Sequence, residues 1–215
     1  MIEYPSIINS SKSPKDTMIA FEKIDGSNIR VKWTDKKGFC LFGSRTQLID
    51  ETHPYLGGVI KVFNKISEPL QEYFNKEYKR STKVDEVIVF GEYYGPNSFA
   101  GLHYDPVEEM MFSAFDVMLI YKSRGSFLLP QEFIKYISPL APTPKVVYEG
   151  NLTDQFVLDV RNNQLEVELN EGVVCKGTKR SGAYRGGVWM CKIKTIKYFE
   201  RLKERYGERW KAYGE

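Results

Sequence analysis

The chain has 215 residues, of which 42% are hydrophobic and 27% are charged, and its formal net charge at pH 7 is +3. These values are typical of an ordinary globular protein with one large domain or two small ones and a sizeable core. A charge excess this mild does not by itself indicate a nucleic-acid partner, so any basic surface must come from local clustering.

The N-terminal third predicts an irregular lead-in followed by strands. Residues 1–17 are polar and contain two prolines, which is typical of irregular structure. Strand character follows at residues 18–22 and 29–33, on either side of Asp25-Gly26. Because glycine accepts positive φ, an Asp-Gly pair between apolar runs favours a hairpin-like turn. A further strand is expected over residues 38–44.

The middle of the chain predicts a helix and two long strands. Residues 58–79 have a helical spacing of apolar side chains, and we expect Pro69 to break or kink this helix. Residues 85–94 and 110–121 read as strands separated by a loop, the second of them interrupted by Asp116. The residues expected on the buried face of the helix are Val59, Val62, Phe63, Ile66, Leu70 and Tyr73.

The last third alternates short helices and strands. Helices are expected over 130–137, starting at a proline, and over 153–162, capped by Thr153. Strands are expected over 145–148, 166–176 and 188–194, and a charged amphipathic helix over 195–215. Many strands with interspersed helices and no βαβ rhythm favour an antiparallel α+β fold, which we expect to form a single domain over residues 1–215.

Cysteine usage and hydropathy indicate the cellular compartment in which the protein works. Cys40, Cys175 and Cys191 form no C-x-x-C pair, so neither zinc nor a disulfide framework is expected, and a reducing setting fits. The sequence shows neither an apolar signal core nor a run of membrane-spanning length. The sequence therefore predicts a cytoplasmic protein, or a nuclear one in a eukaryote.

Lys23 is the leading candidate for a nucleophile. It lies in the run Glu22-Lys23-Ile24-Asp25-Gly26-Ser27-Asn28 at the end of an apolar stretch. A lysine attacks only as the free amine, and with a reference pKa near 10.4 only about one in a thousand is neutral at pH 7.4. A nucleophilic lysine therefore needs burial or cationic neighbours, whereas a solvated lysine at a strand end needs neither.

Two further lysines near the C-terminus meet this need if their strand lies beside Lys23. Lys192 and Lys194 are two residues apart, so on a strand they point to the same face. Two ammonium groups on one face also suit a polyanion such as a triphosphate. An ordinary exposed face is the alternative, because Met190 and Ile193 alternate with the lysines.

Two acids and one aromatic residue complete the candidate set. Glu92 and Glu171 each lie at or near the end of a β-rich run. A carboxylate beside phosphates usually indicates a bridging divalent ion, and Mg²⁺ uses only one or two protein carboxylates. Lysine, carboxylate and metal are the groups that phosphoryl-type transfer needs. Phe115 can stack on a base, although an aromatic in an apolar strand also suits a core.

Five short motifs occur in a characteristic order, and together they resemble those of the covalent nucleotidyltransferase superfamily of polynucleotide ligases and mRNA capping enzymes. Within it the chain looks most like the ATP-dependent RNA ligases of the RNA ligase 2 type, over about residues 22–194. The motifs are the Lys23 run, Ser44-Arg45-Thr46, Val89-Phe90-Gly91-Glu92, Glu171-Gly172-Val173-Val174-Cys175-Lys176 and Lys192-Ile193-Lys194.

The resemblance implies an adenylyltransferase fold of antiparallel sheets flanked by helices, with the nucleotide pocket between them. It implies that Lys23 forms a lysyl-AMP bond, that Glu171 serves the metal, and that Lys192 and Lys194 hold the α-phosphate. Glu22 and Phe115 are implied to contact adenine, and Glu92 the ribose. Arg45 is implied to engage a phosphate or to assist sealing. Asn28 matches an asparagine of the RNA-ligase branch, where DNA ligases and capping enzymes usually have arginine.

The implied reaction is RNA joining in three steps: AMP transfer from ATP to Lys23, transfer to an RNA 5′-phosphate, and attack by a 3′-hydroxyl. ATP and Mg²⁺, or Mn²⁺, are the implied cofactors. Only 21 residues follow Lys194, so the C-terminal accessory domain of related ligases is expected to be absent, and RNA would be engaged by the catalytic domain alone or with an accessory partner. Sealing of nicked DNA, guanylyl transfer and a non-catalytic nucleotide- or RNA-binding module remain alternatives.

Overall fold

The computed structural model describes residues 1–96 and 109–211, which fall into two compact units. Unit 1 comprises Met1–Ser6, Asp25–Pro144 and Lys179–Val188, and unit 2 comprises Ile7–Ile24, Lys145–Thr178 and Trp189–Glu215. Each unit is therefore assembled from segments that are distant in the sequence. The helices within the described ranges are all too short or too polar to cross a membrane.

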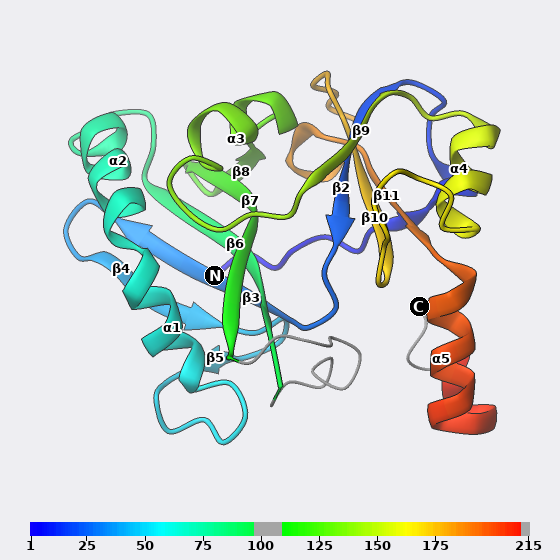
Figure 1. Cartoon of the computed structure of the whole chain (residues 1–215). Helices are drawn as coiled ribbons and strands as arrows, with labels where there is room; N and C mark the ends of the chain where they lie inside the picture. The colour runs from blue at the N-terminus through cyan, green and yellow to red at the C-terminus, as the bar shows by residue number, and fades with distance from the viewer. Residues whose placement is uncertain (97–108, 212–215) are drawn as a thin grey trace. The chain divides into compact units, whose positions relative to one another are not determined.

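Unit 1 is built on a six-stranded antiparallel sheet (Figure 1). Its strand order is β5-β4-β3-β6-β7-β8, and consecutive pairs in this order are hydrogen-bonded. The bounds are β3 Ser27–Thr34, β4 Gly38–Gly43, β5 Leu48–Ile49, β6 Glu86–Tyr94, β7 Met111–Tyr121 and β8 Arg124–Phe127. Three helices accompany the sheet: α1 Gly58–Ile66, α2 Glu68–Tyr78 and α3 Pro130–Tyr136.

The core of unit 1 lies where α1 and α2 cover one face of this sheet (Figure 1). The Phe63 ring of α1 makes edge contacts with Phe39 and Phe112, and Phe74 of α2 contacts Trp33. The expected helical segment is divided as predicted. The first helix ends at Ile66, and Pro69 lies in the first turn of the second, where its missing N–H costs nothing.

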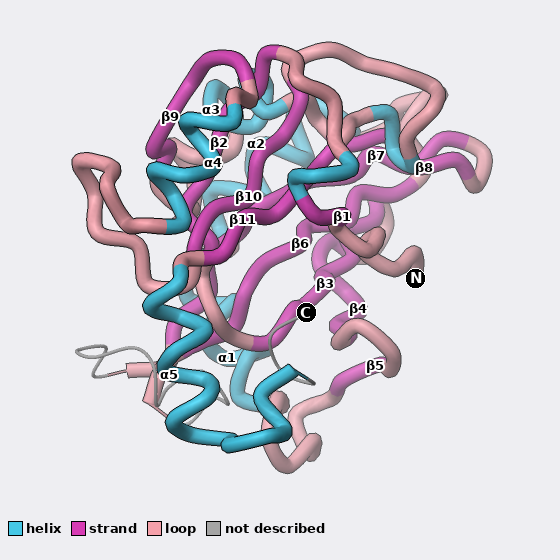
Figure 2. Tube along the Cα trace, turned by 90° about the vertical axis from the view of Figure 1, so that its right-hand side faces the viewer, coloured by secondary structure: helices cyan, strands magenta, loops and turns pink. Residues whose placement is uncertain are grey.

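Unit 2 is built on a five-stranded sheet of order β1-β11-β10-β2-β9. All neighbours are antiparallel except β1, which runs parallel to β11. Figure 2 shows β10 and β11 side by side. The bounds are β1 Ile8–Asn9, β2 Thr17–Lys23, β9 Val146–Asn151, β10 Gly172–Gly177 and β11 Met190–Lys194, with helices α4 Asp154–Arg161 and α5 Ile196–Tyr206.

Helix α4 packs against β10 and β11 through its buried residues Phe156, Val157 and Val160. Thr153 caps this helix as predicted, since its hydroxyl accepts from the Phe156 amide at 3.0 Å. Cys175 and Cys191 are directly paired across β10 and β11 and are fully buried. The strand alternation therefore leaves the other face of β10 and β11 for the lysines.

The hairpin-like turn predicted at Asp25-Gly26 is wrong. Strands β2 and β3 on either side of it belong to different sheets, and Gly26 does not have positive φ. Gly26 is needed for close approach instead, because a Cβ there would lie 2.6 Å from the Tyr93 carbonyl oxygen.

Three further expectations need correction. The strand expected over 166–176 begins only at Gly172, and the terminal helix expected from 195 ends at Tyr206, followed by a 3-10 turn over Gly207–Trp210. Gly207 has a φ of 53°, a conformation that favours helix termination. The lead-in over 1–17 contains β1, a strand of two residues that is too short to produce a pattern in the sequence.

Candidate active site

Lys23 ends β2 with its side chain in contact with Glu171. Its Nζ donates to Glu171 Oε2 at 2.6 Å, and Lys194 Nζ lies 2.9 Å from Glu171 Oε1. The Glu171 side chain is only 2% exposed, and those of Lys194 and Lys23 are 7% and 22% exposed. One buried carboxylate thus holds two ammonium groups, as buried charges require.

The strand register explains why residues so distant in the sequence meet. Gly172 on β10 is the cross-strand partner of Lys23 on one side and of Lys194 on the other. Lys192 pairs with Val174 and so follows Lys194 on the same face, as the sequence predicts. We call Lys23, Lys192, Lys194 and Glu171 the lysine cluster.

Gly172 lets the strands approach at this point. Its φ is 152°, and a Cβ would lie 2.0 Å from the Ile193 carbonyl oxygen and 2.8 Å from Lys194 Cα. No other residue type fits this backbone. The Glu-Gly pair therefore has a structural reason: the glycine admits β11 beside β10, and the glutamate before it reaches both lysines.

Lys176 is the last residue of the strand expected over 166–176 and the first of a basic run that extends to Arg185. That run reads as a solvated loop or as a surface that contacts a nucleic-acid backbone, so sequence patterns do not make Lys176 a candidate for the site. Lys176 lies in β10, 3% exposed, with Nζ 4.9 Å from the centroid of the Phe21 ring. Its even spacing from Gly172 and Val174 puts it on the face of the lysine cluster, and that spacing was the available signal.

Glu22 is not brought to the lysine cluster. Strand alternation places it, with its partner Val173, on the opposite face from Lys23. Burial raises the pKa of Glu22 above its usual value, and the nearby positive charge of Lys145 partly offsets this. The predicted contact of Glu22 with adenine stays a prediction.

Unit 1 contributes a second set of predicted residues. Asn28 on β3 and Glu92 on β6 are direct cross-strand partners, so their side chains share a face. Asn28 Oδ1 is buried and accepts no hydrogen bond from the described residues. An unsatisfied buried acceptor is costly, so Asn28 is a candidate for a ligand contact. With Arg30 and Asp116 these residues form what we call the polar face of the six-stranded sheet.

Phe115 occupies a β-bulge on β7. Phe90 pairs with Asp116 and Gly91 with Ala114, so the register of β6 and β7 shifts at Phe115. A bulge redirects the side chain that it carries and is common beside active sites. Phe115 is half-buried, and its ring meets that of Tyr4 edge-on with centroids 5.0 Å apart.

Arg45 lies in unit 1, in the turn between β4 and β5. Its side chain is exposed, and Nη2 donates to the Ser6 hydroxyl at 2.9 Å. His53 is hydrogen-bonded within its own loop, where its ring nitrogens contact Gln47 and the Tyr55 and Leu56 amides, so a structural role fits it. His103 lies outside the described residues.

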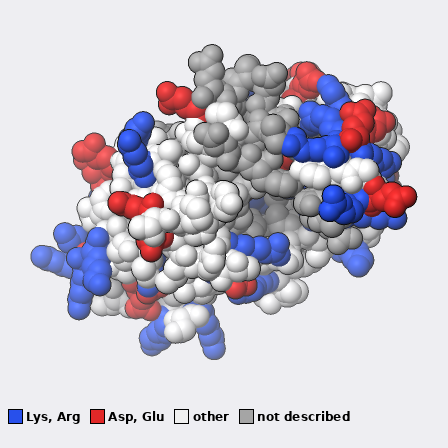
Figure 3. Space-filling view, turned by 90° about the horizontal axis from the view of Figure 1, so that it is seen from below, with Lys and Arg blue, Asp and Glu red and all other residues white. Residues whose placement is uncertain are grey.

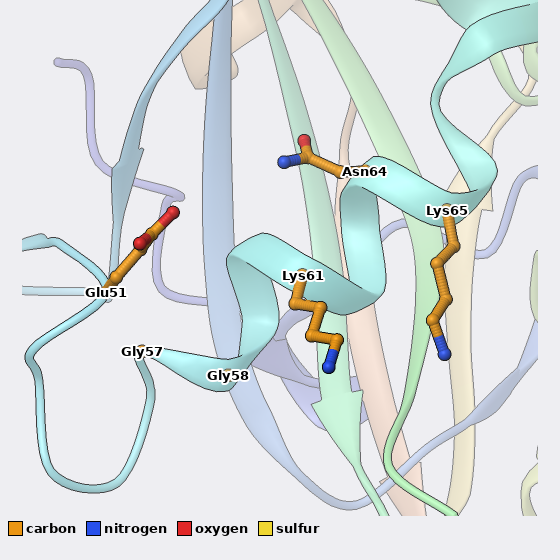
Figure 4. Close-up of a pocket in the computed structure, with 6 residues that line it drawn as sticks. All are labelled: Glu51, Gly57, Gly58, Lys61, Asn64 and Lys65. Atoms are coloured by element: carbon orange, nitrogen blue, oxygen red, sulfur yellow. The ribbon is translucent and has the colours of Figure 1, made fainter.

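Charged surface residues are mixed in sign. On the face drawn in Figure 3, basic and acidic side chains are interspersed over the described part of the chain. An open pocket of about 570 Å³ lies at the start of α1 and is lined by Glu51, Gly57, Gly58, Lys61, Asn64 and Lys65 (Figure 4). No predicted site residue lines this pocket, and both of its lysines are exposed. The pocket is therefore not the candidate active site.

The family model described as RNA ligase matches residues 16–198, which include every predicted site residue. This chain belongs to the RNA ligase family. A search of the curated proteins found no match.

Several structures of Naegleria gruberi RNA ligase share the fold of this family member. An apo mutant matches with 16% identity and a TM-score of 0.69, and another mutant, with ATP and Mn, matches with 18% identity and a TM-score of 0.68. Each match covers 95% of this chain but 59% of the Naegleria chain. The chain therefore spans little more than half the length of these relatives.

Proposed function

We propose that this protein is an ATP-dependent RNA ligase whose nucleophile is Lys23. The observation that carries the proposal is the buried arrangement in which Glu171 holds both Lys23 and Lys194. It stands at the strand ends where the ligase-like motifs occur, in a chain that the RNA ligase family model covers.

In the first step, Lys23 Nζ attacks the α-phosphorus of ATP. A P–N bond forms, the bond between the α-phosphorus and the bridging oxygen breaks, and pyrophosphate leaves with that electron pair. The Lys23 ammonium must first release one proton to give the free amine, and Glu171 Oε2 at 2.6 Å is the acceptor in contact with it. The nitrogen releases a second proton, to solvent, once the P–N bond has formed. Lys192 and Lys194 neutralise the negative charge at the α-phosphate.

For the nucleoside we propose roles on the polar face. Phe115 stacks on adenine, and Glu92 accepts hydrogen bonds from the ribose hydroxyls. Asn28, whose buried Oδ1 lacks a partner among the described residues, contacts the bound nucleotide. Arg45 engages a phosphate, and Glu22 contacts adenine.

A divalent cation, Mg²⁺ or Mn²⁺, fits this donor set in part. The described residues contain no group of three His, Cys, Asp or Glu side chains arranged to hold a metal. Glu171 is the proposed protein ligand, and its two oxygens keep lone pairs beyond those that the lysines occupy. Mg²⁺ commonly takes one carboxylate and completes its shell with substrate phosphates and water, and it would supply charge neutralisation there.

We propose that the AMP then passes to an RNA 5′-phosphate, and that an RNA 3′-hydroxyl attacks this activated end and expels AMP. The proposed partners are ATP, RNA with 5′-phosphate and 3′-hydroxyl ends, and an accessory protein or domain for end recognition. The three cysteines are free, so we also propose an intracellular, cytoplasmic setting.

The test is intact-mass measurement after incubation with ATP and Mg²⁺, with α-labelled ATP in parallel. We expect a gain of one AMP per chain, which Lys23→Ala abolishes. Lys15→Ala is the matched control, because Lys15 is an exposed lysine of the same unit paired only with the exposed Asp154. An unlabelled wild-type protein, or an adduct that persists in Lys23→Ala, contradicts the assignment.

Polymer choice needs a second assay. Nicked RNA, RNA on a DNA splint and nicked DNA are compared as substrates, and we expect the RNA strands to be joined. Preference for the all-DNA nick would make the protein a DNA ligase. Tight RNA binding with no covalent adduct would support a binding module.

A further inference from the structure

The N-terminal segment Met1–Ser6 is attached to the polar face of the six-stranded sheet. Arg30 Nη1 donates to the Met1 carbonyl oxygen at 2.8 Å. The Tyr4 hydroxyl donates to Asp116 Oδ2, and Tyr4 is 9% exposed. Sequence patterns assigned no role to this segment, yet it places a buried tyrosine against two residues of β7.

Tyr4 is the centre of an aromatic cluster. Its ring lies 5.0 Å from that of Phe90, 5.0 Å from that of Phe115 and 5.5 Å from that of Phe127, measured between centroids. The contacts with Phe115 and Phe127 are edge-on, a favoured arrangement of aromatic rings. Phe90 and Phe127 are fully buried, whereas Phe115 keeps part of its surface accessible.

Phe115 needs such support because of its place in the bulge. The register of β6 and β7 shifts at Phe115, and a bulge of this kind redirects the side chain that it carries. Asp116, the next residue, is paired with Phe90 and is 2% exposed. The hydrogen bond from Tyr4 to Asp116 therefore fixes the tyrosine ring at the position where it can limit the movement of Phe115.

The hydroxyl remains a donor over the working pH range. Burial raises the pKa of Tyr4 well above its ordinary value, and the negative charges of Asp116 and Glu92 raise it further. Tyr4 therefore stays protonated and keeps its bond to the buried carboxylate of Asp116. A phenolate at this place would face two acids.

We propose that Tyr4 is a positioning residue for the nucleotide base: its ring holds Phe115 in the orientation that stacks on adenine. This inference rests on the proposed function, since it assumes that Phe115 contacts the base of ATP. Tyr4 itself does not touch the substrate, and it acts through Phe115. The inference gives a specificity role to a segment that lies outside the family-model match.

The test compares the rate of Lys23 labelling by ATP with that by a base-less analogue, methyl ribofuranoside 5-triphosphate, at subsaturating concentrations. The wild type is expected to prefer ATP. Tyr4→Ala should reduce this preference about tenfold, which is within the range of one base–aromatic stacking contact. Labelling by the base-less analogue should hardly change, whereas a merely structural role would slow both substrates equally.

Other variants distinguish the effect of losing the Tyr4 ring from a general loss of folding. Tyr4→Phe keeps the ring and should retain most of the preference for ATP, and Tyr4→Leu replaces Tyr4→Ala if the latter does not fold. Phe39→Ala is the matched control, because Phe39 is a partly buried aromatic residue of the same sheet whose contacts are with the α1 and α2 rings. Its preference should equal that of the wild type.

Phe115→Ala should lose the same preference, and the double variant Tyr4→Ala/Phe115→Ala should lose no more than either single variant. An unchanged preference in Tyr4→Ala or Phe115→Ala, or additive losses in the double variant, overturns the role of Tyr4 while leaving the ligase assignment intact. A wild-type protein that ATP does not label overturns both.

Discussion

The lysine cluster and the polar face are both built on antiparallel strands, but they differ in how their polar groups are satisfied. In the lysine cluster, regular register on adjacent strands brings Lys23 and Lys194 to either side of Gly172, and Glu171 satisfies both. On the polar face, the ladder is interrupted by a bulge, and a buried acceptor of Asn28 lacks a partner among the described residues.

This difference indicates which polar groups find their hydrogen-bond or ionic partners within the protein. Glu171 of the lysine cluster is satisfied within the protein, so losing a member should damage stability and chemistry together. The polar face contains a buried polar group that accepts no hydrogen bond from the described residues. Changes there should therefore affect binding more than folding, and four variants examine this contrast.

The largest effect is expected from Gly172→Ala. A Cβ would lie 2.0 Å from the Ile193 carbonyl oxygen, and φ of 152° is strained for alanine, so we expect a loss of roughly 3 kcal/mol or more and no detectable adenylylation. Thermal unfolding and intact mass provide the measurements. Gly182→Ala is the control, since a Cβ at Gly182 would meet nothing within 4 Å. Equal stability of the two variants would contradict the close approach.

Glu171→Ala comes next. It leaves the Lys194 ammonium, with 7% of its side chain exposed, without the carboxylate, which should cost about 3–5 kcal/mol and stop adenylylation. Glu171→Gln keeps the shape and one acceptor oxygen, so it should recover part of the stability but not the activity. Denaturant unfolding and α-labelled ATP measure the two effects, and an active, fully stable Glu171→Ala would disprove the interdependence.

Asn28→Ala should produce the opposite balance. Because Oδ1 accepts no bond from the described residues, we expect stability to change by less than about 0.5 kcal/mol while adenylylation falls roughly tenfold or more. Lys32→Ala, on the same strand and the same face but paired with Glu86, is the control for surface charge and should remain active. A large loss of stability without a loss of activity would make Asn28 a structural residue.

The smallest effect concerns Glu22 and pH. Its pKa is raised in the folded state by burial, so its protonated form favours folding, and that contribution is lost as pH rises through the folded pKa. Glu22→Gln should therefore raise the melting temperature by about 2 °C at pH 8 and by almost nothing near pH 4. Melting curves across this range, with the exposed Glu149→Gln as the flat control, test the sign.

Regular strands were the part of the fold that sequence patterns predicted well. Apolar patterns predicted the strands on either side of Lys23 and those at 85–94 and 110–121. Proline chemistry predicted the break in the helix at Pro69. The pairing partners were not predictable. Asp25-Gly26 favours a hairpin because a short stretch of sequence shows only the local turn chemistry. The flanking strands β2 and β3 instead belong to different sheets.

The candidate site shows the same division. Lys192 and Lys194 share a face by alternation alone, a prediction that needs no tertiary contact. The contact of Glu171 with both Lys23 and Lys194 depends on which strands are neighbours. Tyr4 and Phe115 are separated by more than half of the chain. No local sequence pattern therefore predicts that their rings come into contact.

By itself, the sequence determined the order of the motifs, the elements that carry them and the chemistry of a lysine nucleophile, because these follow from residue type and short-range spacing. Only the tertiary structure decided that one buried carboxylate serves two lysines, that Lys176 is buried, and that the first six residues pack on the polar face. These outcomes depend on strand partners and burial, which long-range packing sets.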